Sequence, residues 1–349
     1  MMRPIEVGVL GGTGMVGQHF IRFLEGHPWF KLTWLGASDR SAGKKFSDAT
    51  QWRLEGEAPS SIRDIVVSDC QPKSAPKLVF SAMDASVATE IEQAFARAGH
   101  IVVSNSRNHR MEADVPLLVP EINPGHLSVI AAQRKNRGWQ GAIVTNPNCS
   151  TIVLTMALAP LVPFGIRSVI VSTMQAVSGA GYPGVASMDI VGNVVPYIGS
   201  EEEKMQSETQ KILGGYVDGS FRPLEAAVSA HCNRVAVVDG HMTAASVRLE
   251  SKPGAEEVQQ AIETFRGVPQ EKKLPSAPAQ PVVYLSQQDR PQPRRDALRN
   301  NGMSVTVGRV RPCPVLDIKF VACGHNTIRG AAGAAVLNAE LMVSEGILD

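Results

Sequence analysis

The sequence predicts two domains, an α/β domain with a parallel, doubly wound sheet and an α+β domain with a mixed sheet. Its 349 residues exceed what one hydrophobic core usually holds. Strand-like and helix-like segments alternate over about the first 150 residues, which is the pattern of a parallel sheet. Longer strand-like runs with few helices between them follow, and such runs are typical of a mixed or antiparallel sheet.

The predicted first domain contains short apolar runs separated by two helices. The expected strands are residues 5–10, 32–37, 77–82, 101–104 and 142–145. The first helix carries Val16, Phe20, Phe23 and Leu24 on one face. The second helix has an apolar stripe of Val87, Ile91, Ala94, Phe95 and Ala98, and ends near Gly99.

The predicted second domain has strands at residues 168–174, 234–238, 244–249, 304–310 and 316–322. A helix among them carries Val258, Ile262 and Phe265 on one face. Residues 274–295 are rich in proline and are expected to form a surface excursion. An alanine-rich helix, residues 330–343, closes the chain.

Composition excludes several classes of protein. Lys plus Arg (34) against Asp plus Glu (33) gives a net charge of +1, so neither a nucleic acid nor a membrane surface is the expected partner. Five cysteines at irregular spacing argue against disulfides and against a metal site. The first ten residues lack a signal-peptide pattern, and the longest apolar stretch is too short to cross a bilayer. We therefore expect a soluble, cytoplasmic protein.

A glycine-rich turn, Gly12-x-Gly14-x-x-Gly17, stands between the first strand and the first helix. Glycine there permits a tight turn and close backbone approach to a pyrophosphate, while the helix N-terminus attracts its charge. In this context the motif predicts a Rossmann-type dinucleotide-binding domain, although a plain glycine-rich turn remains an alternative. The expected cofactor contacts in this turn are Gly12, Thr13, Gly14, Met15 and Val16.

The segment after the second strand bears on the choice of cofactor. Asp39 would bind the ribose hydroxyls of NAD, whereas Arg40 would hold the 2′-phosphate of NADP. Ser38, Ser41 and the two lysines that follow favour NADP. A solvated basic loop is the alternative.

Cys149 is the expected nucleophile. Pro147 prevents a helix before it and an apolar run follows, so the cysteine should lie at a helix N-terminus. Exposed amides there would favour the thiolate and could stabilise an oxyanion. The other four cysteines are expected to be inert.

Two further patterns supply charged side chains. Arg234 and His241 are expected to bracket a strand and its exit, so that both could reach one cleft. The imidazole could transfer protons and the guanidinium could bind a carboxylate. The run from Glu201 to Lys211 begins a helix, and such charge runs are usually solvated faces.

Seven motifs in this order resemble the aspartate-semialdehyde dehydrogenase family, in particular its archaeal and fungal type. The motifs span nearly the whole chain and are GGTGMVG, ASDRSAGK, TNPNCST, QAVSGAGYPG, EEEK with a later E..KILG, RV with a later DGH, and HNTIRGAAGAA. The resemblance implies an NADP-binding domain of residues 1–147 plus 325–349, and a catalytic and dimerisation domain of residues 148–324. It also implies a homodimer or a dimer of dimers.

The resemblance further implies a role for each matching residue. Cys149 would be the nucleophile, His241 the acid–base and Gln175 the group that orients the acyl intermediate. Arg234 would bind the substrate's α-carboxylate and Glu201 its amino group. Arg110 and Lys204 would hold phosphate, with Arg107 as an alternative to Arg110, and Asn326 and Thr327 would lie near the nicotinamide.

The implied reaction is the NADPH-dependent reduction of L-4-aspartyl phosphate to L-aspartate 4-semialdehyde and phosphate, through a cysteine thioester and without a metal. Three alternatives stay open. A malonyl-CoA-reductase-like enzyme would keep Cys149 and His241 but take a thioester. N-acetyl-glutamyl-phosphate reductase uses similar chemistry, but its motifs fit less well. A dinucleotide-binding paralogue without turnover is a non-enzymatic alternative, against which the intact set of Cys149, His241, Gln175 and Arg234 argues.

Overall fold

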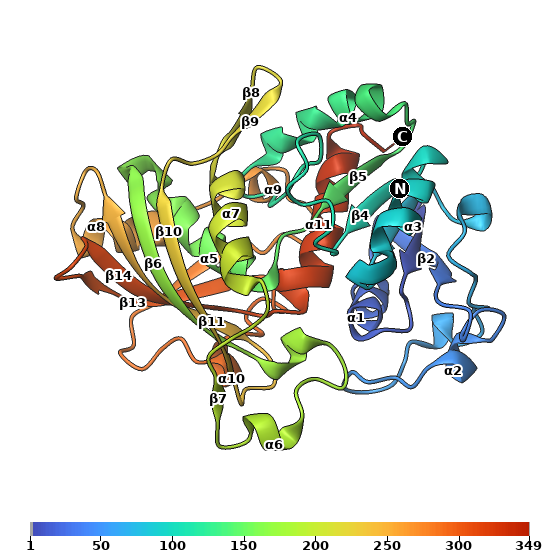
Figure 1. The fold of residues 1–349 in the computed structure, drawn as a ribbon, viewed down its shortest axis with the longest axis horizontal. Helices are drawn as coiled ribbons and strands as arrows, with labels where there is room; N and C mark the ends of the chain where they lie inside the picture. Colours follow the sequence, from blue (N-terminus) through green and yellow to red (C-terminus); the bar gives the residue numbers. More distant parts are fainter. Residues whose placement is uncertain (1–2, 349) are drawn as a thin grey trace.

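The computed structural model describes residues 3–348. Residues 1, 2 and 349, at the outer ends of the predicted first domain, lie outside this range. Two sheets lie side by side, each with its own helices, and the two chain ends lie together on the side of the smaller sheet (Figure 1). The predicted combination of a parallel sheet and a mixed sheet is confirmed.

The smaller sheet has the strand order β2-β1-β3-β4-β5, and every pair is parallel. Its strands are β1 (Ile5–Leu10), β2 (Phe30–Gly36), β3 (Leu78–Ser81), β4 (Ile101–Ser104) and β5 (Ala142–Thr145). The five predicted strands are confirmed, three of them with the expected bounds. The chain adds β2 on one side of β1, and then β3, β4 and β5 on the other side. Ligands of such sheets bind at the carboxyl ends of the strands beside this switch point, between β1 and β3.

Alternate residues of these strands face opposite sides of the sheet, as strand geometry requires. Val103 packs in the cluster that contains α1 (Met15–Leu24) and the C-terminal helix α11 (Gly333–Ser344). Val102 packs on the other side, with α3 (Ala85–Arg97). The last helix of the chain therefore packs on the first sheet, while the domain bounds at 147/148 and 324/325 stay a prediction.

The apolar stripe predicted for α3 is wrong in part. Val87 is 44% exposed and Ala98 is also exposed. Glu92 is fully buried instead, because its carboxylate accepts hydrogen bonds from the hydroxyls of Ser81 (2.6 Å) and Ser104 (2.7 Å). A polar contact with two strands thus sets the rotation of this helix.

The larger sheet has the order β12-β13-β14-β11-β6-β10-β7. The pairs β6–β10 and β12–β13 are parallel and the others are antiparallel, which makes the sheet mixed as predicted. Its strands are β6 (Ile166–Gln175), β7 (Val194–Val195), β10 (Ala227–Val235), β11 (His241–Leu249), β12 (Val282–Leu285), β13 (Val305–Pro312) and β14 (Ile318–Gly324).

One face of this sheet is covered by helices. α5 (Cys149–Leu158), α7 (Glu201–Leu213) and α8 (Ala255–Thr264) share a hydrophobic cluster with the inward residues of the strands. The residues that alternate with them are more open, and Ile170 of β6 is 47% exposed. The remaining helices and strands are short or peripheral: α2 (Phe46–Ala49), α4 (Val129–Arg137), α6 (Ser187–Ile190), α9 (Val268–Glu271), α10 (Pro293–Asp296), β8 (Gly215–Val217) and β9 (Ser220–Arg222).

Two expectations for the second domain are wrong. Residues 274–295 are not only a surface excursion, because they contain the edge strand β12, whose Val282 is fully buried. The strand expected at 234–238 is β10, which ends at Val235. Arg234 is therefore the last residue but one of β10, His241 is the first residue of β11, and no strand lies between these two.

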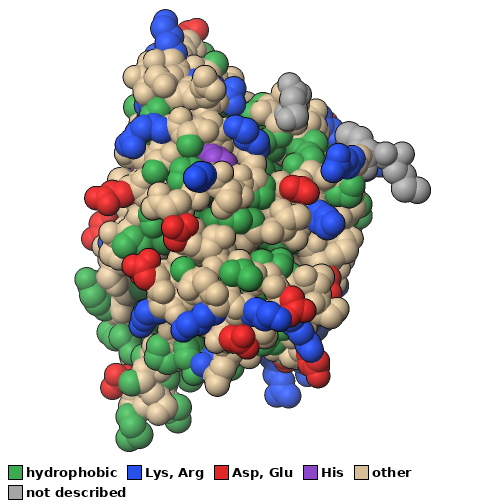
Figure 2. Space-filling view, turned by 90° about the vertical axis from the view of Figure 1, so that its right-hand side faces the viewer, with side chains coloured by type: hydrophobic (Ala, Val, Ile, Leu, Met, Phe, Trp, Pro, Cys, Tyr) green, Lys and Arg blue, Asp and Glu red, His purple; other side chains and the backbone are tan. Residues whose placement is uncertain are grey.

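The distribution of charged side chains on the surface fits the net charge of +1. On the face shown in Figure 2, basic and acidic side chains are interspersed. No helix within residues 3–348 is long and apolar enough to cross a membrane.

Candidate active site

Cys149 is the first residue of α5, as the sequence predicts. The residue before it, Asn148, is the N-cap, and its side-chain oxygen accepts the amide hydrogens of Ser150 (3.0 Å) and Thr151 (3.1 Å). Asparagine favours this position because it satisfies amides that have no partner inside the helix. Asn148 thus occupies the amides of Ser150 and Thr151, and the expectation that amides at this helix start stabilise an oxyanion stays a prediction.

Three strands of the larger sheet end or begin at one edge beside Cys149. Gln175 ends β6 and pairs with Arg234 of the parallel strand β10. His241 opens the antiparallel strand β11, next to Met242, which pairs with the last residue but one of β6. Antiparallel pairing brings the start of one strand to the end of its neighbour. The sheet register thus collects Gln175, Arg234 and His241 at one edge.

His241 lies against the cysteine. Its Nε2 is 3.2 Å from Sγ of Cys149, and its Nδ1 accepts the backbone N–H of Ala176 at 3.0 Å. An imidazole nitrogen that accepts a hydrogen bond carries no proton, so the neutral ring has its proton on Nε2. That proton faces the sulfur atom.

Both members of the pair are neutral in this site at pH 7. Burial, reinforced by the charge of Glu201, raises the pKa of Cys149 to about 12. Burial, reinforced by Arg234, lowers the pKa of His241 to about 3. A resting thiolate–imidazolium pair is therefore disfavoured, and positive charge brought near the sulfur would promote ionisation.

Arg234 and His241 both form hydrogen bonds with the backbone of Ala176. Nη1 of Arg234 donates to the carbonyl of Ala176 at 2.8 Å, while the N–H of the same residue holds His241. The guanidinium is largely buried. It lies beside Gly179, where a Cβ atom would stand 2.9 Å from Nη1 of Arg234 and 2.9 Å from Cε1 of His241. Only glycine fits there.

Glu201 is the first residue of α7 and is largely buried. Its carboxylate accepts hydrogen bonds from Nζ of Lys204 (2.8 Å), Nδ2 of Asn148 (2.9 Å) and Nε2 of Gln175 (3.3 Å). Burial opposes ionisation, but Lys204 and the two amides outweigh it and lower the pKa of Glu201. The carboxylate is ionised at neutral pH.

A cleft of about 650 Å³ lies next to these groups and reaches their neighbours Asn148, Gly179 and Lys204. Arg107, Arg110, Asn148, Gly179 and Lys204 are among its lining residues. Arg107 is exposed, whereas Arg110 is buried and bonded. Both arginines reach the cleft, so the choice between them stays open.

The glycine-rich turn has the geometry that a pyrophosphate needs. Gly11 has a φ of 73°, and a Cβ on Gly17 would stand 2.3 Å from the carbonyl oxygen of Gly11. The N-cap of α1 is Gly14, which makes no side-chain cap. The first amides of α1 are therefore open to an anion. Beside them lie Thr13, Met15 and Val16, which are partly exposed.

The segment after β2, where the sequence predicts contacts with the ribose of the cofactor, is mostly exposed. Ser38, Asp39 and Arg40 are exposed, and Ser41 is buried in a turn that its N–H closes on the carbonyl of Ser38 at 2.8 Å. Both the acidic and the basic side chain remain available.

Comparison with known proteins agrees with this arrangement. Residues 6–130 match the family model described as semialdehyde dehydrogenase, NAD binding domain, and residues 158–329 match semialdehyde dehydrogenase, dimerisation domain. Aspartate-semialdehyde dehydrogenase of Methanothermobacter thermautotrophicus is 50% identical, over 97% of this chain and 99% of its own. That of Archaeoglobus fulgidus is 48% identical, over 98% and 99%. This chain belongs to the aspartate-semialdehyde dehydrogenase family.

Solved structures of the family share the fold. The crystal structure of the Candida albicans enzyme with NADP superposes with a TM-score of 0.92, at 44% identity over 99% of this chain and 100% of that one. A Vibrio cholerae aspartate-semialdehyde dehydrogenase II gives 0.76 at 29% identity, over 98% and 99%. The resemblance to the archaeal and fungal type is confirmed.

The two residues expected near the nicotinamide follow β14 in this family member. Asn326 donates to Oγ of Ser178 at 2.8 Å and accepts the N–H of Gly240 at 2.9 Å. Thr327 precedes a π-helical turn, Ile328–Ala332, in which a Cβ on Gly330 would stand 2.8 Å from Cβ of Cys149. The segment therefore lies beside the nucleophile.

Sequence reasoning missed four residues of the site. Asn148 caps α5 and holds Glu201, while Gly179 and Gly330 leave room beside the reacting groups. Glu208, buried in α7, binds Arg110. Each lies in one of the motifs quoted above. Glycines and runs of charged residues are common outside functional sites, however, so the local sequence alone does not indicate their roles.

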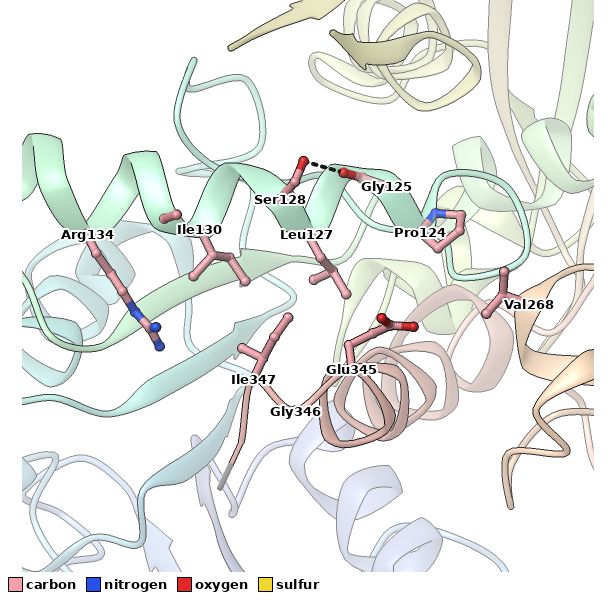
Figure 3. A pocket seen from close by; sticks show the side chains of 11 residues that line it. Pro124, Gly125, Leu127, Ser128, Ile130, Arg134, Val268, Glu345, Gly346 and Ile347 are labelled. Carbon is pink, nitrogen blue, oxygen red and sulfur yellow. Dashed lines mark hydrogen bonds between the residues drawn. The ribbon is translucent and has the colours of Figure 1, made fainter. Parts of the chain in front are cut away.

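Two findings concern regions outside the site. Within residues 3–348, no group of three or more His, Cys, Asp or Glu side chains could hold a metal ion. A separate cavity of about 660 Å³ lies between α4 and the C-terminal segment, with Leu127, Ile130 and Ile347 pointing into it (Figure 3). No predicted site residue lines that cavity.

Proposed function

We propose that this chain reduces L-4-aspartyl phosphate to L-aspartate 4-semialdehyde and phosphate with NADPH, in the cytoplasm, as a step towards lysine, threonine, methionine and isoleucine. The observation that carries the proposal is the 3.2 Å approach of Cys149 Sγ to His241 Nε2, with Arg234, Gln175 and Glu201 at the same edge. Family membership supports it, since the relatives named above are aspartate-semialdehyde dehydrogenases.

The three charged groups of the substrate are matched by an arginine, a carboxylate and a basic pair of side chains in the site. Arg234 is suited to the α-carboxylate, and the ionised Glu201 to the α-ammonium group. Arg110 and Lys204 line the cleft on the side suited to the phosphate. Malonyl-CoA has no ammonium group to join Lys204, Asn148 and Gln175 at the carboxylate of Glu201, so it should be a poor substrate.

The protein's own groups account for the covalent steps. The sulfur of Cys149 attacks the acyl carbon while its thiol proton passes to the departing phosphate. The bond to phosphate breaks and a thioester forms, with Arg110 and Lys204 neutralising the charge of the leaving group. Bound NADPH supplies the hydride that reduces this thioester. The carbon–sulfur bond of the resulting thiohemiacetal oxyanion then breaks and releases the aldehyde and the Cys149 thiolate. The Nε2–H of His241 donates a hydrogen bond to that thiolate before a proton from solvent restores the thiol.

The cofactor proposal is NADP rather than NAD. The open amides of α1 and the exposed Ser38 and Arg40 support it, as does the NADP complex of the Candida albicans relative. Arg40→Ala should raise KM for NADP by about tenfold or more, because a charge-assisted hydrogen bond contributes about 1.5–3 kcal/mol. Equal efficiency of the wild-type enzyme with NAD and NADP would contradict this reading.

The deciding experiment measures phosphate-dependent oxidation of aspartate semialdehyde by absorbance of the reduced cofactor. Cys149→Ala should lose turnover by several orders of magnitude while still binding NADP, because it removes the nucleophile. Glu201→Gln should impair the amino-acid substrate selectively. Efficient reduction of malonyl-CoA without activity on aspartate semialdehyde would refute the proposal.

We further infer a homodimer or a dimer of dimers. The match to a dimerisation-domain family model and the open face of the larger sheet, with Ile170 47% exposed, support it. Light scattering should give at least twice the mass of one chain. A monomer at micromolar concentration would contradict it.

A further inference from the structure

One face of α7 carries charged residues at positions 201, 204, 208 and 211, a spacing that places all four on one side of the helix. The helix stands between the two sheets (Figure 1). Glu201 and Lys204 belong to the site described above. Glu208 and Lys211 are buried as well, although the sequence gives them no role and favours a solvated face.

Glu208 joins two segments that are distant in sequence. Its Oε1 accepts a hydrogen bond from Nη1 of Arg110 at 2.9 Å, and its Oε2 accepts the backbone N–H of Asn148 at 2.7 Å. The carboxylate is only 2% exposed. Because each oxygen has its own donor, the carboxylate cannot rotate without losing one of them. It is anchored beside the nucleophile and holds the arginine from there.

Arg110 has little other support for its side chain. Its Nη2 donates to the carbonyl of Asn105 at 2.7 Å, and its Nε has no partner among the described residues. The guanidinium nonetheless borders the cleft together with Lys204. Glu208 therefore fixes the position of Nη1 of this guanidinium.

The backbone of the same segment is held by a different group. Nζ of Lys211 donates to the carbonyls of Arg110 (2.8 Å), Glu112 (2.9 Å) and Val115 (2.9 Å). Loss of the Glu208 contact should thus free the arginine side chain while the chain around it stays in place. Asn148 likewise keeps its contacts to Ser150 and Glu201.

We propose that Glu208 is a positioning residue that acts through Arg110 and orients its guanidinium towards the phosphate group of the substrate, at a fixed distance from Cys149. The inference rests on the proposed function, in which Arg110 binds that phosphate. Two effects oppose each other when Glu208 is neutralised. Removal of a negative charge would by itself strengthen anion binding, whereas loss of orientation weakens it. The proposal requires the second effect to dominate.

Glu208→Gln tests this in the oxidative direction. We expect KM for phosphate to rise by about tenfold, the effect of about 1.4 kcal/mol, while KM for NADP stays unchanged. The burst of NADPH formed without phosphate should keep its rate within about twofold, because phosphate takes no part in that step. Glu203→Gln is the matched control, since it makes the same change on an exposed position of the same helix. A fall in KM for phosphate, or a lower melting temperature with unchanged kinetics, would overturn the proposal.

A double-mutant cycle separates action through Arg110 from any other cause. In an Arg110→Ala background, Glu208→Gln should change KM for phosphate no further, whereas additive effects would overturn the proposal. Calorimetry with inorganic phosphate provides a readout apart from turnover. We expect weaker binding to Glu208→Gln than to the wild type, and equal binding would count against Glu208. Wild-type protein that binds phosphate but lacks activity would instead refute the proposed function.

Discussion

At the scale of single residues, the hydrogen bond from Ala176 to Nδ1 of His241 has the largest chemical consequence. It keeps the proton of the neutral ring on Nε2, and protonation of Nδ1 would break it. The histidine is therefore a donor towards Cys149 in the resting enzyme. This arrangement differs from a cysteine–histidine ion pair, in which the imidazole has already taken the thiol proton.

The pH dependence of alkylation tests this arrangement. Because the pKa of Cys149 is raised to about 12 and that of His241 is lowered to about 3, neither group is charged between pH 5 and 9. The rate of iodoacetamide modification of the ligand-free enzyme at Cys149, followed by mass spectrometry, should rise steadily up to pH 10. A plateau reached below pH 8 would show that a thiolate already exists at neutral pH.

Gly179 gives a second prediction at this scale. In Gly179→Ala the new methyl carbon would stand 2.9 Å from Arg234 and His241, too close for either side chain to keep its position. We expect turnover to fall by at least about tenfold with little change in melting temperature, because displacement of about an ångström at a reacting group is costly in rate. Gly125→Ala, where a Cβ meets nothing within 4 Å, is the control. Wild-type kinetics in Gly179→Ala would show that the loop yields freely.

At the scale of elements, the start of α5 combines a structural and a chemical function in Asn148. Its oxygen caps the helix and its amide nitrogen holds Glu201. The two contacts use opposite ends of one amide group, so substitutions can separate them.

Asn148→Ala should lower the free energy of unfolding by about 1 kcal/mol, the usual effect of losing an N-cap. Asn148→Ser should restore most of that stability, because serine also caps helices, but its shorter side chain lacks the amide nitrogen that reaches Glu201. Both variants should therefore raise KM for aspartate semialdehyde. Urea titration and steady-state kinetics provide the two measurements, and kinetic recovery in the serine variant would argue against a role for the amide donor.

At the scale of the whole molecule, buried histidines make the protein sensitive to mild acid. Burial, with Arg234 next, lowers the pKa of His241 to about 3; burial, with His325 next, lowers that of His19 to about 4; and burial, with Lys211 next, lowers that of His126 to about 4. Below pH 6.5 these three imidazoles bind protons in the unfolded chain but not in the folded chain. Stability is thus complete above pH 6.5 and is lost as the pH falls towards 4.

For each histidine that stays unprotonated in the folded state, the free energy of unfolding should fall by about 1.4 kcal/mol per pH unit in this window. The urea midpoint should therefore fall between pH 6.5 and 5, before the carboxylates titrate. His126→Gln, a change outside the catalytic cleft, should reduce that slope. A constant midpoint from pH 7 to pH 5 would show that the histidines accept protons in the folded state.

The sequence by itself determined the features that depend on neighbours along the chain. Short apolar runs fixed β1, β4 and β5 within their observed bounds, because each strand is buried on both faces. Pro147 and Asn148 fixed the start of α5 at Cys149, because the proline disfavours helix before it and the asparagine caps the turn after it. Both signals act through the local backbone.

Only the tertiary structure decided the features that depend on contacts between distant segments. The register of β10 against β6 sets Arg234 beside Gln175, although the sequence suggested a strand between Arg234 and His241. Glu208 is buried against a partner 98 positions away, so helical periodicity could not distinguish it from a solvated charge. Gly179 is confined by side chains from other strands. Local patterns specify which elements form, whereas the energy of a buried charge or a close approach depends on what the fold places opposite it.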